Sequence, residues 1–290
     1  MTPRSPARRR LLAAGAAVLL ARAVRGTAAD AADAAVPSAA QIVEANARAR
    51  GGVDAWRRIE TMAWAGHTES ASAPGRKLAF LLEQKRPGST RFEVVNDGQR
   101  AIRVYDGSIG WKLRPNAKGV PELQSYTDEE LRYARGAQVI EGPLMDYAAK
   151  GAVLAVEGVG EAQGRRAYVL QARLPSGGMH RVWIDAQNWL ELRHDREVRG
   201  ASGQPGVVSV SFRDYRAFDG LMIPLTIETG SGSAAAASRL VIEKVALNPV
   251  LDERMFAAPN VPSARKHSIT VDTRTAGATG GAAAARTASP

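Results

Sequence analysis

The residues best suited to acid–base catalysis or metal binding are four histidines, at positions 67, 180, 194 and 267. None of them is spaced like the ligands of a His-x-x-x-His metal motif. His180 and Asp185 fall in one predicted strand but on opposite faces, so they cannot act together directly. We therefore interpret each histidine as a surface or turn residue, and we expect no metal site.

Nucleophilic chemistry is not indicated either. The chain has no cysteine, which excludes disulfides, thiol catalysis and cysteine metal ligands. Gly-x-Ser-x-Gly and His-Glu-x-x-His motifs are absent. The acidic run from Asp128 to Glu130 opens a predicted helix, where the helix dipole favours negative charge. The sequence therefore predicts a binding protein that is not an enzyme and has no catalytic residue and no cofactor.

Apolar and aromatic side chains are the remaining candidates for a functional site. Taken singly, each is typical of core packing. Together they exceed what two short helices could cover on a curved sheet, which favours an apolar pocket with a few polar groups at its rim. The expected ligand-binding residues from these strands are Trp64, Phe80, Leu82, Phe92, Val94, Val104, Trp111 and Leu113. Which strand faces line the pocket stays open, because a one-residue error in register reverses them all.

The elements that must position these residues are mostly strands. From residue 61 onward apolar residues alternate with polar ones, which indicates antiparallel strands with one buried face. Turn signals such as Asn96-Asp97-Gly98 and Ala73-Pro74-Gly75 separate the first runs. Later strands are predicted at 152–158, 166–174, 179–185, 189–198, 207–217, 222–229 and 238–247. A helix from Ser38 to Gly51 and a helical insert from Thr127 are also predicted. The predicted fold is therefore one curled antiparallel sheet with helices on its concave face.

The two ends of the chain have a different character. Arg8, Arg9 and Arg10 precede an apolar run and small-residue cleavage options, so residues 1–34 are predicted to be a cleaved export signal, with a twin-arginine route possible. Residues 261–290 are predicted to be a disordered tail. Most of the formal charge of +10 lies in these ends, which argues against nucleic-acid binding, and no stable membrane anchor is expected.

Several motifs between residues 38 and 260 resemble those of the outer-membrane lipoprotein-sorting proteins, the LolA-like group, and of its larger members more than of the carrier itself. They are Gly51-Gly52-x-x-Ala55-Trp56, Lys85-Arg86-Pro87, Asp106-Gly107 followed by Trp111, Glu141-Gly142-Pro143-Leu144, Asp219-Gly220-Leu221-Met222-Ile223-Pro224 and Leu247-Asn248-Pro249.

The resemblance implies an unclosed half β-barrel of about 11 strands over residues 35–260, with acyl chains held in its concave face. It also implies a periplasmic location, acyl lipid or lipoprotein cargo, and handover proteins at the inner and outer membranes. Arg86 occupies the position of an arginine that contacts the lid and gates the cavity in the carrier, which makes it a ninth expected site residue. An envelope sensor or protein-interaction domain on the same fold is the alternative, and an enzyme acting on an apolar substrate is a third.

Overall fold

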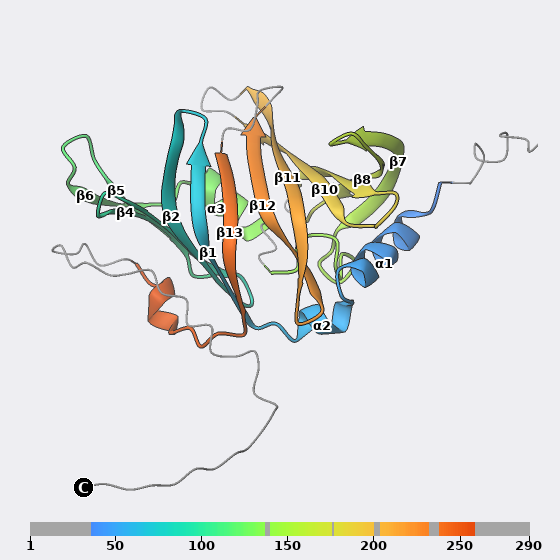
Figure 1. The fold of residues 1–290 in the computed structure, drawn as a ribbon, viewed down its shortest axis with the longest axis horizontal. Coiled ribbons are helices and arrows are strands. Elements are labelled where there is room, and N and C mark those ends of the chain that lie inside the picture. Colours follow the sequence, from blue (N-terminus) through green and yellow to red (C-terminus); the bar gives the residue numbers. More distant parts are fainter. Residues whose placement is uncertain (1–35, 137–139, 176, 200–203, 232–237, 259–290) are drawn as a thin grey trace, which may run out of the picture. The chain divides into compact units, whose positions relative to one another are not determined.

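A single large antiparallel sheet dominates the computed structural model, which describes residues 36–136, 140–175, 177–199, 204–231 and 238–258 (Figure 1). Its strand order is β6-β5-β4-β3-β2-β1-β13-β12-β11-β10-β9-β8-β7, so β6 and β7 are its edges. The strands are β1 (Thr61–Ser70), β2 (Ala73–Lys85), β3 (Ser89–Asn96), β4 (Gln99–Tyr105), β5 (Gly110–Pro115), β6 (Pro121–Ser125), β7 (Val153–Ala162), β8 (Arg165–Arg173), β9 (Met179–Asp185), β10 (Glu191–Arg199), β11 (Pro205–Phe218), β12 (Leu221–Ser231) and β13 (Ser238–Leu247). None of the helices in the described ranges is both long and apolar enough to cross a membrane.

Local sequence accounts for the helices. Ser38 and Gln41 form a capping box at the start of α1 (Ala39–Ala49), and Gly51 follows the helix with a φ of 109°. The short α2 (Val53–Arg57) buries Trp56. Thr127 and Glu130 form a second capping box at the start of α3 (Asp128–Gly136), through hydrogen bonds of 2.9 and 3.2 Å. A 3₁₀ turn, η1 (Glu253–Phe256), follows the last strand.

The first and last strands of the chain, β1 and β13, are neighbours in the sheet and pair with one irregularity. β1 pairs with β13 from Met62 to Ser70, and the register shifts between Ala65 and Gly66. A Cβ atom built on Gly66 would lie 2.0 Å from the carbonyl oxygen of Val241, so only glycine fits there without movement. Bulges bend the strand that carries them. This one lies in the middle of the thirteen strands, where a bend helps the sheet to curl.

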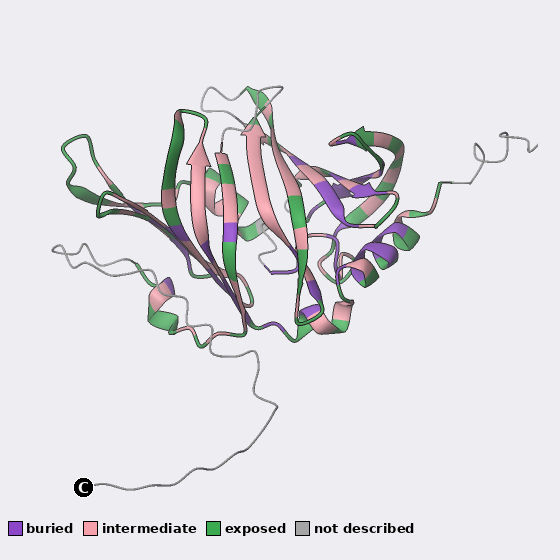
Figure 2. Cartoon of the chain, in the orientation of Figure 1, coloured by how far each residue is buried: buried purple, intermediate pink, exposed green. Residues whose placement is uncertain are grey.

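The concave face of the sheet is covered by three separate elements. α1 packs on Leu170, Val182 and Ile184 at the β8–β9 end. α2 and the segment from Ile140 to Met145 pack on Met62 and Ile223 near the centre. α3 lies behind the central strands in Figure 1 and contacts β5 at the other end. Figure 2 shows buried residues along α1 and along strands β8–β10.

The convex face is covered at one end by the chain after β13. Phe256 of η1 packs with Ile102, Val104 and Leu113, with Leu251 and Met255 beside them. The side chain of Phe256 is only 3% exposed. On β4 and β5 the buried apolar side chains therefore lie on the convex face, whereas the sequence pattern indicates a single buried face for the sheet.

Most of the predicted architecture is confirmed, with two differences in detail. The unclosed sheet has thirteen strands where the resemblance implies about eleven. β6 is the strand that the sequence pattern did not reveal, since Pro121–Ser125 is an edge strand without apolar alternation and begins with proline. The first hairpin turns at Ala71 and Ser72, ahead of the predicted Ala73-Pro74-Gly75, which belongs to β2. The predicted export signal (residues 1–34) and tail (residues 261–290) lie outside the described residues.

Candidate ligand-binding cavity

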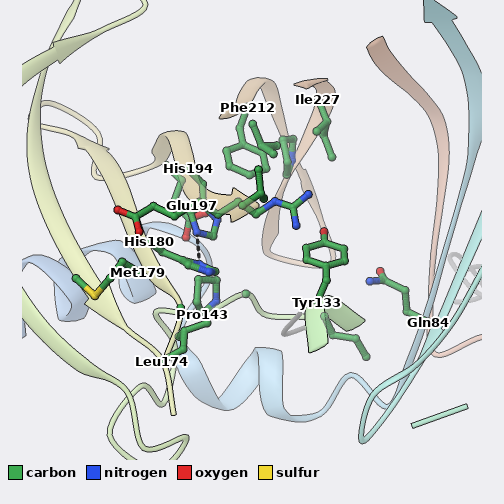
Figure 3. Close-up of a pocket in the computed structure, with 18 of the residues that line it drawn as sticks. Gln84, Tyr133, Pro143, Leu174, Met179, His180, His194, Glu197, Phe212 and Ile227 are labelled. Carbon is green, nitrogen blue, oxygen red and sulfur yellow. Dashed lines mark hydrogen bonds between the residues drawn. The ribbon is translucent and has the colours of Figure 1, made fainter. Parts of the chain in front are cut away.

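A cavity of about 610 Å³ lies on the concave face between the covering elements (Figure 3). Its walls come from β1 and β2 on one side and from β9 to β12 on the other, and α2, α3 and residues 140–143 close it. A volume of this size is within the range of pockets that hold small organic ligands. The cavity therefore exists because the sheet curls and because α1 and α3 cover opposite ends of it.

Apolar side chains form much of the wall. Figure 3 shows Phe212 and Ile227 at one end of the cavity and Pro143 and Leu174 at the other. Trp64 on β1 and Val210 on β11 also line it. Phe212 and Ile227 are direct partners in the β11–β12 pairing, so their side chains lie on the same face of the sheet.

The floor is a buried polar network centred on Arg50, the C-cap of α1. Its guanidinium donates a 2.7 Å hydrogen bond to the carbonyl of Glu141 and lies 3.4 Å from the carboxylate of Glu191. Trp56 donates to the carbonyl of Arg50 at 2.9 Å, and its ring faces the guanidinium at 4.5 Å. Tyr215 donates to the carbonyl of Glu191, and burial raises the pKa of this tyrosine. The network joins α1, β10 and the segment that starts at Ile140.

Arg86 holds the same segment from the other side. Its guanidinium donates to the carbonyls of Ile59 and Trp56 at 2.8 and 3.1 Å, and it pairs with the Glu141 carboxylate at 2.8 Å. Lys150 pairs with the second carboxylate oxygen of Glu141 at 2.7 Å. Burial alone would raise the pKa of Glu141, but Lys150 and Arg86 outweigh burial and hold it below its usual value. The closing segment is therefore anchored by ion pairs next to the cavity.

Two histidines and an arginine line the β9–β10 side of the cavity. The rings of His180 and His194 are joined by a 2.8 Å hydrogen bond (Figure 3). Burial and the nearby Arg196 lower the pKa of His180 to about 4, and burial, His180 and Arg196 lower the pKa of His194 to about 3. Both rings are thus neutral at pH 7. The guanidinium of Arg196 lies 3.7 Å from the ring centre of Tyr133 on α3, across the cavity.

No protein-family model and no curated protein sequence matches the chain. Among solved structures, a LolA superfamily protein from Nitrosomonas europaea superposes with a TM-score of 0.50 at 12% sequence identity, over 76% of this chain and 98% of that one. The chain has a LolA-like fold. An outer membrane lipoprotein-sorting protein domain from Vibrio parahaemolyticus has a TM-score of 0.48 at 13% identity, over 75% of this chain and 95% of that one. A DUF1329 family protein from Desulfovibrio piger has a TM-score of 0.46 at 14% identity, over 76% and 98%. At 12% identity the likeness to the LolA superfamily protein is one of fold, and it confirms the fold that the sequence resemblance implies.

The predicted lining residues fall into two groups in this LolA-like sheet. By cross-strand register, one face carries Trp64, Phe80, Leu82, Phe92 and Val94, and of these Trp64 lines the cavity directly. Phe80 and Phe92 are in ring contact at 5.8 Å, on the concave face beyond the cavity wall. The opposite, convex face carries Val104, Trp111 and Leu113, with Val104 and Leu113 packed on Phe256.

The sequence analysis did not identify the polar residues of the cavity, and its interpretation of His180 and His194 as surface or turn residues was wrong, because both lie in strands that line the cavity. His180, His194 and Arg196 are brought together by the β9–β10 hairpin, in which Arg196 pairs with His180 and Val182 pairs with His194. The three-residue gap between the predicted strands 179–185 and 189–198 contained this signal, because a short hairpin fixes which positions of its two strands lie opposite each other. Arg50, Glu141 and Glu191 come from three distant segments, so no local pattern could have revealed them.

Proposed function

We propose that this protein is a periplasmic carrier that binds the acyl chain of a lipid or a lipid-modified protein in the concave cavity. The observation that supports this most is the cavity of about 610 Å³ with Trp64, Phe212 and Ile227 in its wall. Burial of an acyl chain contributes about 0.8 kcal/mol per methylene, so a chain of roughly twelve carbons contributes about 10 kcal/mol before the costs of binding. The LolA-like fold, shared with a LolA superfamily protein, agrees with this function.

The lid of this carrier is α3. None of the α3 side chains that the structure describes is fully buried, and Tyr133 is 53% exposed. The helix is held by Glu130, which pairs with Lys112 at 2.8 Å and Arg103 at 2.9 Å, and by Tyr133 against Arg196. Arg103 is exposed, and pairs of this kind typically contribute less than about 1 kcal/mol, whereas the Lys112–Glu130 pair is partly buried. An element attached in this way can open for cargo at small cost in free energy.

Arg86 is proposed to act as the gate on the opposite side. It ties the β2–β3 turn to α2 and to Glu141, whose neighbour Gly142 lines the cavity. Breaking this contact removes one polar anchor of Glu141 and leaves those from Lys150 and Arg50, so the closing segment is loosened next to the cavity. The proposed lining for cargo therefore consists of the concave-face residues, and Arg86 lies outside this wall, next to the segment that closes the cavity.

The first test is native mass spectrometry of the protein purified from periplasm, followed by lipid analysis of its organic extract. Co-purified acyl lipids or a lipid-modified protein are expected as discrete adducts. A ligand-free mass, together with one stoichiometric protein partner, would contradict the carrier and favour an interaction domain.

A matched pair of variants tests where the acyl chain binds. Val210 lines the cavity from β11, whereas Val207 on the same strand is 38% exposed and faces the other way. Val210→Gln places a polar amide in the apolar wall and is expected to weaken binding of a fluorescent fatty acid by at least about tenfold, because burying a polar group without a hydrogen-bond partner is costly. Val207→Gln should bind as the wild type does. Equal affinities in the two variants would place the ligand elsewhere.

A further inference from the structure

Arg196 is a cation inside the cavity without a counter-charge in the described part of the chain. Its side chain is only partly exposed, its Nε atom is buried, and this N–H has no hydrogen-bond partner there. The other cavity arginine on the floor, Arg50, pairs with Glu191, and on the same strand Arg193 pairs with Asp195. Glu197 also borders the cavity, but it is exposed and forms no ion pair with Arg196. A partly buried guanidinium is costly unless an anion pairs with it.

The contact with Tyr133 leaves the hydrogen-bonding edge of Arg196 open. The Tyr133 ring lies against the guanidinium at 3.7 Å, as in a cation–π contact. All five N–H donors of a guanidinium point outward in its own plane, where they match a carboxylate or a phosphate. An anion in the cavity can therefore bind Arg196 while Tyr133 stays in place on α3.

The surrounding polar groups favour the same kind of ligand. The indole N–H of Trp64, on the β1 side, is a second buried donor without a partner among the described residues. His180 and His194 beside Arg196 bond to each other and are neutral at pH 7, so they add no second charge. A ligand that brings acceptor atoms and one negative charge can pair with the Arg196 guanidinium, whereas a neutral hydrocarbon cannot.

We propose that the cavity selects an amphiphile with an anionic head group, a carboxylate or a phosphate ester, and that Arg196 binds the anion. This rests on the proposed function, because the apolar wall must take the acyl chain of the same molecule. Arg196 would then link cargo to lid, since the guanidinium that binds the head group also contacts Tyr133.

The test compares dodecanoate with dodecanol, which share a chain and differ in charge, by calorimetry at neutral pH. Wild-type protein is expected to bind dodecanoate at least about tenfold more tightly, as a charge-assisted hydrogen bond would provide. Arg196→Met should lose this preference and keep its affinity for dodecanol, and Arg196→Lys should keep part of it. Arg166→Met is the matched control: Arg166 on β8 is exposed and lies outside the cavity wall, and its loss removes the same charge but should leave the preference intact. Thermal unfolding of each variant verifies folding.

The outcomes separate the inference from the function beneath it. Equal binding of the two amphiphiles by wild-type protein, or a preference that survives in Arg196→Met, would contradict the proposed selection of an anionic head group by Arg196. It would not contradict the proposed binding of acyl chains. Binding of neither amphiphile would overturn both. Inorganic phosphate serves as the third ligand: if it binds as tightly as dodecanoate and in an Arg196-dependent way, the site takes a free anion and not an amphiphile.

Discussion

Lowering the pH from about 7 to about 5 is expected to destabilise the ligand-free protein through His180 and His194. Burial, with the Arg196 charge nearby, lowers their pKa values from 6.5 to about 4 and about 3. The unfolded chain takes up protons as the pH falls through 6.5, while the folded protein does not, so acid favours unfolding in this window. Stability due to the neutral pair is complete above the unfolded pKa and is lost progressively down to the folded values.

The magnitude follows from the size of the window. Each pH unit below the unfolded pKa costs about 1.4 kcal/mol per histidine, so at about pH 5 each histidine costs about 2 kcal/mol. His180 is partly exposed, and solvent screening reduces its share, which leaves about 3 kcal/mol for the pair. The comparison stops at pH 5 because acidic side chains such as Glu141, whose pKa is lowered from 4.5, begin to contribute below that.

Urea unfolding at the two pH values measures this effect directly. The double variant His180→Gln/His194→Gln keeps hydrogen-bonding side chains but does not titrate, and it should lose about 3 kcal/mol less than the wild type between the two pH values. His67→Gln is the control, because His67 lies away from the pair and bonds to Glu243 at 2.7 Å. It should retain the greater part of the fall. A fall of equal size in the double variant and the wild type would refute the reasoning, since the titrating groups would then lie elsewhere.

Two further predictions concern the gate and the convex face. Arg86→Leu removes the contact with Glu141 and should speed the release of a bound fluorescent fatty acid about tenfold in stopped-flow displacement. The control, Lys85→Leu, loses only an exposed ion pair and should not change the release rate. Equal release rates in the two variants would contradict the proposed role of Arg86 as a gate. Phe256→Ala removes a buried ring and should lower the free energy of unfolding by about 3 kcal/mol in urea titration. The control, Val250→Ala, changes a fully exposed position and should lower it by less than about 0.5 kcal/mol. A similarly small loss in both variants would show that η1 does not cover the sheet.

Local sequence pattern was sufficient for most of the strands. The predicted runs at 179–185 and 238–247 coincide with β9 and β13, because alternation and turn residues act over a few positions. Asp97 and Gly98 both have positive φ, as the predicted Asn-Asp-Gly turn requires. β6 was missed because an exposed edge strand needs no apolar face.

The cavity could be predicted only in part, since its position depends on contacts between distant segments. Alternation places Trp64 and Val104 in strands but does not say which face of each strand is concave. Val104 packs on Phe256, about 150 residues later in the chain, and this cover allows an apolar residue on the convex face. The floor likewise depends on Arg50 meeting Glu141 and Glu191, an arrangement that hydrophobic periodicity does not encode.

The two helices on the concave face differ in how they are attached, and this difference determines which of them can move. α1 buries Ile42 and Val43 against the sheet, so lifting it would expose core residues and cost several kcal/mol. α3 buries none of the side chains that the structure describes and depends on Glu130 and Tyr133 for its contacts with the sheet. Elements with few buried apolar contacts open at low free energy. Cargo should therefore enter beneath α3, and the residue that it meets there is Arg196.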